Sequence, residues 1–77
     1  MTKHQLVKAV PELLSRVLSS TARTDEQKLE YLDFVEGMLD RAANNLAPDG
    51  SDSDLHMPMA DLFGRIGELR RELENDS

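Results

Sequence analysis

TDEQKLEYLDFVEGMLDRAANNL, residues 24–46, is the stretch that decides the fold class of this 77-residue chain. Apolar residues in it recur at alternating intervals of three and four, which is the period of one face of an α-helix. They are Leu32, Val35, Leu39, Ala42 and Leu46. Thr24 and Gln27 have the spacing of a capping box, in which each side chain accepts a hydrogen bond from the other residue's backbone N–H. The stretch therefore predicts an amphipathic helix over residues 25–46.

The segment before it predicts another helix, over residues 3–20, where Thr2 and Gln5 repeat the capping-box spacing. Its apolar positions are Leu6, Val10, Leu13 and Val17, with Leu14 and Leu18 beside them. Pro11 removes one backbone hydrogen bond and crowds the preceding turn. Because the apolar stripe keeps its phase across Pro11, we expect one kinked helix rather than two helices.

The C-terminal part predicts a third helix, over residues 55–74, after an Asp- and Ser-rich loop at 47–54. Its apolar residues have the spacing of an uninterrupted heptad seam. They are Leu55, Met59, Leu62, Ile66, Leu69 and Leu73. Gly64 and Gly67 in this helix indicate either a close approach to a neighbouring helix or simple tolerance at exposed positions, and both interpretations stay open.

Strand-like alternation is absent, and the chain is long enough for a single domain, residues 1–77. Helices of similar length with short connections favour antiparallel neighbours. We therefore expect an all-α fold of three antiparallel amphipathic helices, as a small helical bundle or as a helical hairpin completed by dimerisation.

The chain contains no cysteine, which excludes disulfides and thiolate metal sites. Below about 70–80 residues a single core rarely supplies more than ~3–5 kcal/mol, so small folds usually need additional stabilisation. We therefore expect a homodimer. The start of the chain lacks the apolar run of a signal peptide, and no window reaches the ~20 apolar residues of a membrane span. We expect a cytoplasmic protein with no membrane partner.

The formal net charge is −6, and a surface of this sign repels phosphate backbones, so we expect no direct binding to nucleic acid. The acidic residues of the second helix recur at helical spacing along one side. They are Glu26, Glu30, Asp33, Glu36 and Asp40, and we refer to them as the acidic ridge. The plain interpretation is a solvated outer face. The alternative is an acidic mimic of nucleic acid that blocks a DNA- or RNA-binding protein.

The residues that could bind a metal ion or a phosphate group, or act in catalysis, lack the spacing that such sites require. Counted from Asp49 or from Asp52, the Asp-rich loop does not place glycine at position 6 and glutamate at position 12, as an EF-hand requires, so a solvated turn is expected. His4 and His56 lie in different segments, and neither has a second ligand at helical spacing. No glycine-rich phosphate loop is present. We expect no catalytic residue, no metal, no cofactor and no enzyme activity.

The feature that points to a function is surplus apolar surface. Tyr31, Phe34 and Met38 widen the apolar side of the second helix, and the third helix adds Met57, Met59 and Phe63. Methionines adapt to a partner's shape and aromatic residues anchor interfaces. The predicted partner-binding residues are Tyr31, Phe34, Met38, Met59 and Phe63, with Glu30, Asp33 and Asp40 as an electrostatic rim. The competing interpretation is that these apolar residues complete a compact core.

These observations predict a small acidic regulatory protein without enzyme activity, which inhibits, sequesters or adapts another protein through a helical surface. The nucleic-acid mimic is the second hypothesis. A small helical enzyme is the third and least favoured, because a slim bundle offers little cleft in which a carboxylate could be desolvated.

Overall fold

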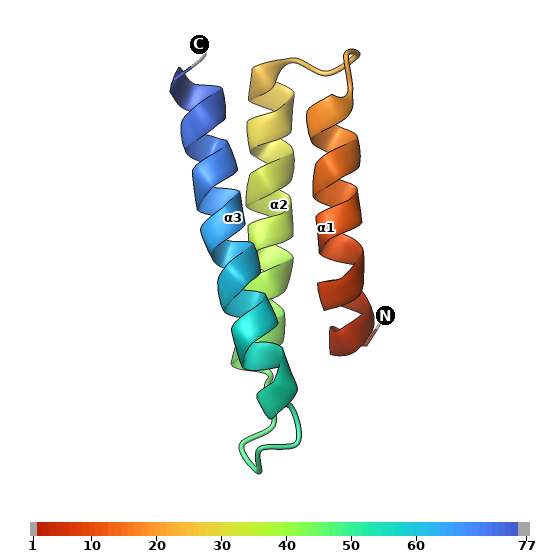
Figure 1. Ribbon diagram of the computed structural model, residues 1–77, viewed down its shortest axis with the longest axis vertical. Coiled ribbons are helices and arrows are strands. Elements are labelled where there is room, and N and C mark those ends of the chain that lie inside the picture. Colours follow the sequence, from red (N-terminus) through yellow and green to blue (C-terminus); the bar gives the residue numbers. More distant parts are fainter. Residues whose placement is uncertain (1, 76–77) are drawn as a thin grey trace.

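The computed structural model describes residues 2–75 and contains three α-helices. They are α1 (Lys3–Ser19), α2 (Asp25–Asn44) and α3 (His56–Asn75), with a short 3-10 helix, η1 (Ser53–Leu55), directly before α3. The chain runs along α1, returns along α2 and turns again into α3 (Figure 1). No strand is present within the described part of the chain. The all-α prediction is confirmed.

Both predicted capping boxes form. Thr2 Oγ1 accepts a hydrogen bond from the Gln5 backbone N–H at 3.1 Å, and Gln5 Oε1 accepts one from the Thr2 N–H at 2.9 Å. The corresponding distances for Thr24 and Gln27 are 3.2 and 3.0 Å. Two otherwise unsatisfied N–H groups at each helix start therefore have partners.

The helix ends differ from the prediction by one or two residues. α1 continues as one helix through Pro11 and ends at Ser19. α2 ends at Asn44 rather than at residue 46, and beyond it the Leu46 backbone N–H donates to the Ala43 carbonyl, three residues back, instead of continuing the four-residue helical pattern. The Asn45 side chain also donates to the Arg41 carbonyl at 2.8 Å at this helix end. Leu46 therefore lies outside the helix, although it still packs against the core around Leu55.

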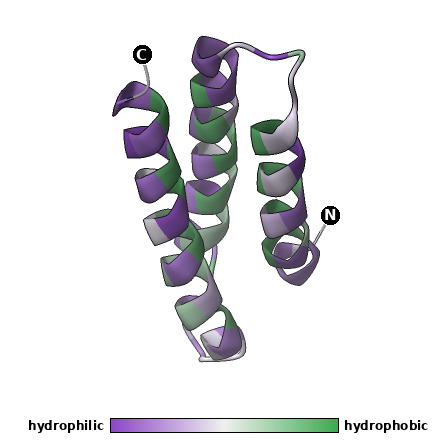
Figure 2. Cartoon of the chain, turned by 45° about the horizontal axis from the view of Figure 1, so that its top comes forward, coloured by the Kyte–Doolittle hydropathy of each residue, from purple (hydrophilic) through white to green (hydrophobic). Residues whose placement is uncertain are grey.

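The core runs along the inner sides of all three helices, where Figure 2 shows hydrophobic colour facing the centre of the bundle. α2 packs more extensively against both neighbours than α1 packs against α3. The residues buried in this core are Val10, Leu14, Val17, Leu32, Val35, Leu39, Ala42, Leu55, Met59, Leu62, Ile66 and Leu73. The two seams predicted for residues 25–46 and 55–74 thus supply most of these buried residues.

The Asp-rich loop is not simply a solvated turn, so that prediction is wrong for one residue. Asp52 is only 8% exposed. Its carboxylate accepts hydrogen bonds from the Lys3 ammonium and, at 2.9 Å, from the Ala47 backbone N–H. These bonds, the one from Lys3 first, lower the pKa of Asp52 below its ordinary value. The loop turns at Gly50, whose φ of +86° is a conformation that glycine adopts without steric cost.

Candidate protein-binding surface

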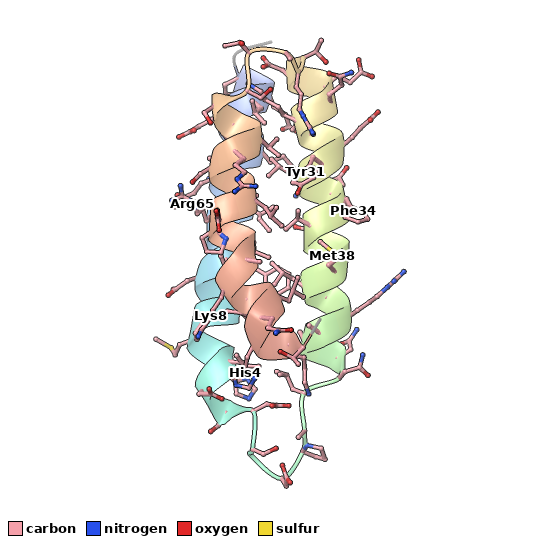
Figure 3. The ribbon with its side chains drawn as sticks, turned by 90° about the vertical axis from the view of Figure 1, so that its right-hand side faces the viewer. His4, Lys8, Tyr31, Phe34, Met38 and Arg65 are labelled. Carbon is pink, nitrogen blue, oxygen red and sulfur yellow. The ribbon has the colours of Figure 1, made fainter. Side chains whose placement is uncertain are left out.

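Phe34 is the most exposed aromatic residue on α2. Its side chain is 61% exposed, and it points away from α1 at the outer edge of the bundle (Figure 3). Its neighbours along the helix surface are Tyr31 and Met38, which are half-buried and pack against the core. The Tyr31 and Phe34 rings lie 6.3 Å apart, centroid to centroid, in a tilted arrangement. Together these three side chains form an apolar stripe that continues from the core to solvent.

We define the α2 face as this apolar stripe with the polar and small residues beside it. Its members are Glu30, Tyr31, Phe34, Gly37, Met38 and Arg41. They share one side of α2 because a helix with 3.6 residues per turn brings positions three and four apart onto one face.

Tyr31 is held in place from outside the helix. The guanidinium of Arg23, in the α1–α2 loop, lies 5.5 Å from the centroid of the Tyr31 ring, within the range of a cation–π contact. Arg23, Gln27, Glu30 and Tyr31 line a shallow open hollow at this end of the α2 face. A second open groove, between α1 and α2, includes Met38 and Arg41. The α2 face is therefore flanked by depressions at both ends.

The acidic ridge is partly neutralised by α3. The guanidinium of Arg70 donates to Asp33 at 2.7 Å and to Glu36 at 3.4 Å. These contacts, the one to Glu36 first, raise the pKa of Arg70. Within residues 2–75, Glu30 and Asp40 pair with no cation. Two of the three predicted rim carboxylates are thus free, and the third, Asp33, contributes to the α2–α3 contact.

The predicted residues of α3 do not join the α2 face. Met59 is 3% exposed and belongs to the core with Ala42 and Leu55, so its prediction as a surface contact is wrong. Its position in the heptad seam, rather than the adaptability of methionine, decides its place. Phe63 is half-buried and packs against the core. Met57, which is not one of the predicted partner-binding residues, is 75% exposed at the start of α3.

The polar groups of the described residues show no arrangement typical of a catalytic or metal centre. No group of three or more His, Asp or Glu residues that could hold a metal ion is found in residues 2–75. His4 Nε2 lies 3.0 Å from Asp54 Oδ2, in an exposed contact between α1 and η1. The two hollows beside the α2 face, and a third between α1 and α3 that Pro11, Pro58 and Arg65 help to line, contain no histidine.

No family model, no curated protein and no solved structure matches this chain. None of the helices in residues 2–75 is long and apolar enough to cross a membrane. Fold and surface together define a small all-helical, three-helix protein whose α2 face combines an exposed aromatic residue with two charges, those of Glu30 and Arg41, that form no ion pair within residues 2–75.

Proposed function

We propose that this protein is a small regulatory module without enzyme activity, which acts in the cytoplasm by binding other protein chains through the α2 face. The observation that carries the proposal is the exposure of Phe34 next to Tyr31 and Met38, whereas the other large apolar side chains of residues 2–75, apart from Met57, are buried or half-buried. Aromatic side chains that stay exposed near a polar rim are typical anchors of protein interfaces.

The rim supports the same proposal. Glu30 and Asp40 carry charges that no cation of residues 2–75 neutralises, and Arg41 forms no ion pair in that range either. Exposed charges around an apolar centre set the orientation and rate of association more than its strength. Binding through the α2 face should therefore depend on Phe34 for affinity and on the rim for selectivity.

The ion pairs of Arg70 weigh against the nucleic-acid mimic. A mimic needs a continuous row of unpaired negative charge, whereas Arg70 binds Asp33 and Glu36 in the middle of the acidic ridge. The two hypotheses predict different responses to salt, because exposed charges are screened beyond ~8–10 Å at moderate ionic strength and apolar contacts are not.

The experiment is affinity purification of the tagged chain from its native host, beside two variants. Phe34→Glu places a charge at the centre of the α2 face, and Met57→Glu makes the same change at an exposed methionine outside it. We expect a bound protein that wild type and Met57→Glu retain and Phe34→Glu loses. Retention of the same protein by Phe34→Glu would contradict the proposal. If wild type released the bound protein when the salt concentration was raised from about 50 to about 200 mM, and Phe34→Glu bound that protein as well as wild type does, the nucleic-acid mimic would be favoured.

A further inference from the structure

The α2 face contains a second heptad seam, separate from the buried one. Gln27, Tyr31, Phe34, Met38 and Arg41 follow each other at intervals of four, three, four and three. The buried seam of the same helix contains Leu32, Val35, Leu39 and Ala42. The exposed seam extends about 20 Å along α2, from a 1.5 Å rise over fourteen steps, which is long enough for another helix to pack against it.

This seam is complementary to itself when two copies run antiparallel. If the two α2 helices cross at Phe34, a residue that precedes Phe34 in one copy has the same height along the helix axis as the residue that follows Phe34 by the same number of positions in the other copy. Glu30 of one copy therefore lies at the height of Met38 of the other, and Tyr31 at the height of Gly37. At about 100° per residue, Tyr31 and Met38 lie on one side of Phe34, and Glu30, Gly37 and Arg41 on the other. A two-fold axis that passes through the crossing point places the Tyr31 and Met38 side of one copy against the same side of the other copy, and the Glu30, Gly37 and Arg41 side against its own equivalent. Tyr31 therefore meets Met38 of the second copy on the apolar side, and Phe34 meets Phe34 at the centre.

The charges on the other side are also complementary. Arg41 lies about 10.5 Å beyond the crossing, and Glu30 and Glu26 of a second copy lie about 6 and about 12 Å along the same direction. Arg41 is exposed and forms no ion pair within residues 2–75, so it is free to bind both carboxylates. Gly37 leaves room for the Glu30 side chain, because a Cβ built there meets nothing within 4 Å.

We propose that the α2 face binds a second copy of this chain, as an antiparallel α2–α2 pair with Phe34 on the two-fold axis. The inference rests on the proposed function, in which the α2 face is the binding surface, and it names one occupant of that surface. A uniformly basic partner would suit Glu30 and Asp40, but it would be repelled by Arg41. A second copy brings Glu30 to Arg41 and Arg41 to Glu30, so it pairs the charges of both signs on the α2 face.

The first measurement is sedimentation velocity of the full chain from about 1 to about 300 µM, a range in which a weak dimer forms and dissociates. We expect wild type and Met57→Glu to change from monomer to dimer, and Phe34→Glu to stay monomeric throughout. Because Phe34 is exposed, this variant keeps the fold, which circular dichroism verifies. A Phe34→Glu variant that still dimerises like wild type would overturn the proposed interface.

The second measurement tests the register by charge reversal. Arg41→Glu should raise the dimer dissociation constant about tenfold, since the contacts of both Arg41 residues with Glu26 and Glu30 of the other copy become repulsive. Adding Glu26→Arg and Glu30→Arg to Arg41→Glu should restore the wild-type value. A triple variant no tighter than Arg41→Glu alone would overturn the antiparallel pairing.

A third measurement uses the absence of cysteine. In Phe34→Cys the introduced thiol is the only one in the chain, and on the two-fold axis it lies next to its symmetry mate. We expect mild oxidation to cross-link Phe34→Cys faster than Met57→Cys, and equal rates would contradict the geometry. A wild-type chain that is monomeric at every concentration would overturn self-association. The proposed function is tested separately by the affinity purification, and it fails if Phe34→Glu retains the bound protein.

Discussion

The ammonium group of Lys3, in the first turn of α1, donates a hydrogen bond to the carboxylate of Asp52, 49 positions further along the chain. The same ammonium donates to the Asn45 backbone carbonyl at 2.9 Å, and the Ala47 N–H donates to Asp52. One ion pair thus connects the start of α1, the end of α2 and the loop before α3. Since α1 and α3 contact each other least, this link helps to hold the start of α1 against the α2–α3 pair.

We expect Asp52→Asn to destabilise the fold at neutral pH and to lose this effect in acid. Hydrogen bonds from Lys3 and Ala47 lower the folded-state pKa of Asp52 below its ordinary value of 3.8. Such a carboxylate contributes stability that is fully present above the unfolded pKa and is lost as the pH falls through the folded one. The urea midpoint of Asp52→Asn should lie below that of wild type at pH 7, and the two midpoints should approach each other as the pH falls below the ordinary pKa of 3.8.

Asp61→Asn, at an exposed position of α3, is the matched control and should behave like wild type. The pKa of Asp49 is also lowered, first by the hydrogen bond from the Ser51 backbone N–H, so part of the acid sensitivity remains in Asp52→Asn. A constant difference in midpoint between Asp52→Asn and wild type from pH 7 to pH 3 would show that the carboxylate charge is not responsible.

Leu39→Ala and Phe34→Ala should differ strongly in stability, although both residues are large, apolar and on α2. Leu39 is fully buried, so its truncation leaves a cavity and should cost about 2–5 kcal/mol of unfolding free energy. Phe34 is exposed, and its truncation should change the same quantity by less than about 0.5 kcal/mol. Urea denaturation at low micromolar protein, where self-association is weakest, gives both values. Similar losses would mean that Phe34 belongs to the core.

The glycines should respond to alanine in opposite directions. A Cβ at Gly64 or Gly67 meets nothing within 4 Å, so the structure favours tolerance over close helix approach. Each substitution should raise the unfolding free energy by about 0.5–1 kcal/mol, because alanine loses less backbone entropy in a helix. Gly50→Ala should lower it by about 1–2 kcal/mol, because its φ of +86° strains a side chain. Thermal melts of the three variants beside wild type measure these changes in stability. A Gly64→Ala variant less stable than wild type would be inconsistent with open space around Gly64.

Removal of the α2 cap should cost about 1 kcal/mol. In Thr24→Ala the Gln27 backbone N–H loses the hydroxyl acceptor that now lies 3.2 Å away. Thr21→Ala, in the loop before the helix, removes the same hydroxyl outside the capping box and should leave the urea midpoint unchanged. The prediction fails if the two threonine variants have equal midpoints.

The helix starts and the buried seams could be predicted because their causes are local. Thr2, Gln5, Thr24 and Gln27 form their capping boxes from residues three positions apart, which the sequence displays directly. The end of α2 was harder to predict, because Leu46 continues the apolar period although the helix ends at Asn44. Periodicity alone does not show where a helix ends.

The candidate surface was predicted only in part. Phe34 is exposed as expected, but Met59, chosen for the same chemical reasons, is buried. Asp33 was expected on a free rim and instead pairs with Arg70 of α3. The burial of Met59 follows from its place in the heptad seam of the third helix, which the sequence displays. The pairing of Asp33 cannot be read from α2, since it depends on Arg70, which lies 37 positions away.

The amino-acid sequence by itself determined that this chain forms three helices, where two of them begin, and which stripe of α2 and α3 enters the core. Helix capping and the 3.6-residue period act between near neighbours, so they are present in the linear order of residues. The tertiary structure alone decided that Asp52 is buried against Lys3, that Arg70 neutralises part of the acidic ridge, and which of the two interpretations of Phe34 holds, an exposed residue or part of the core. A side chain at the edge of a helix is buried, or forms an ion pair, only where another helix or loop lies beside it. Which helix or loop lies there depends on how the helices pack.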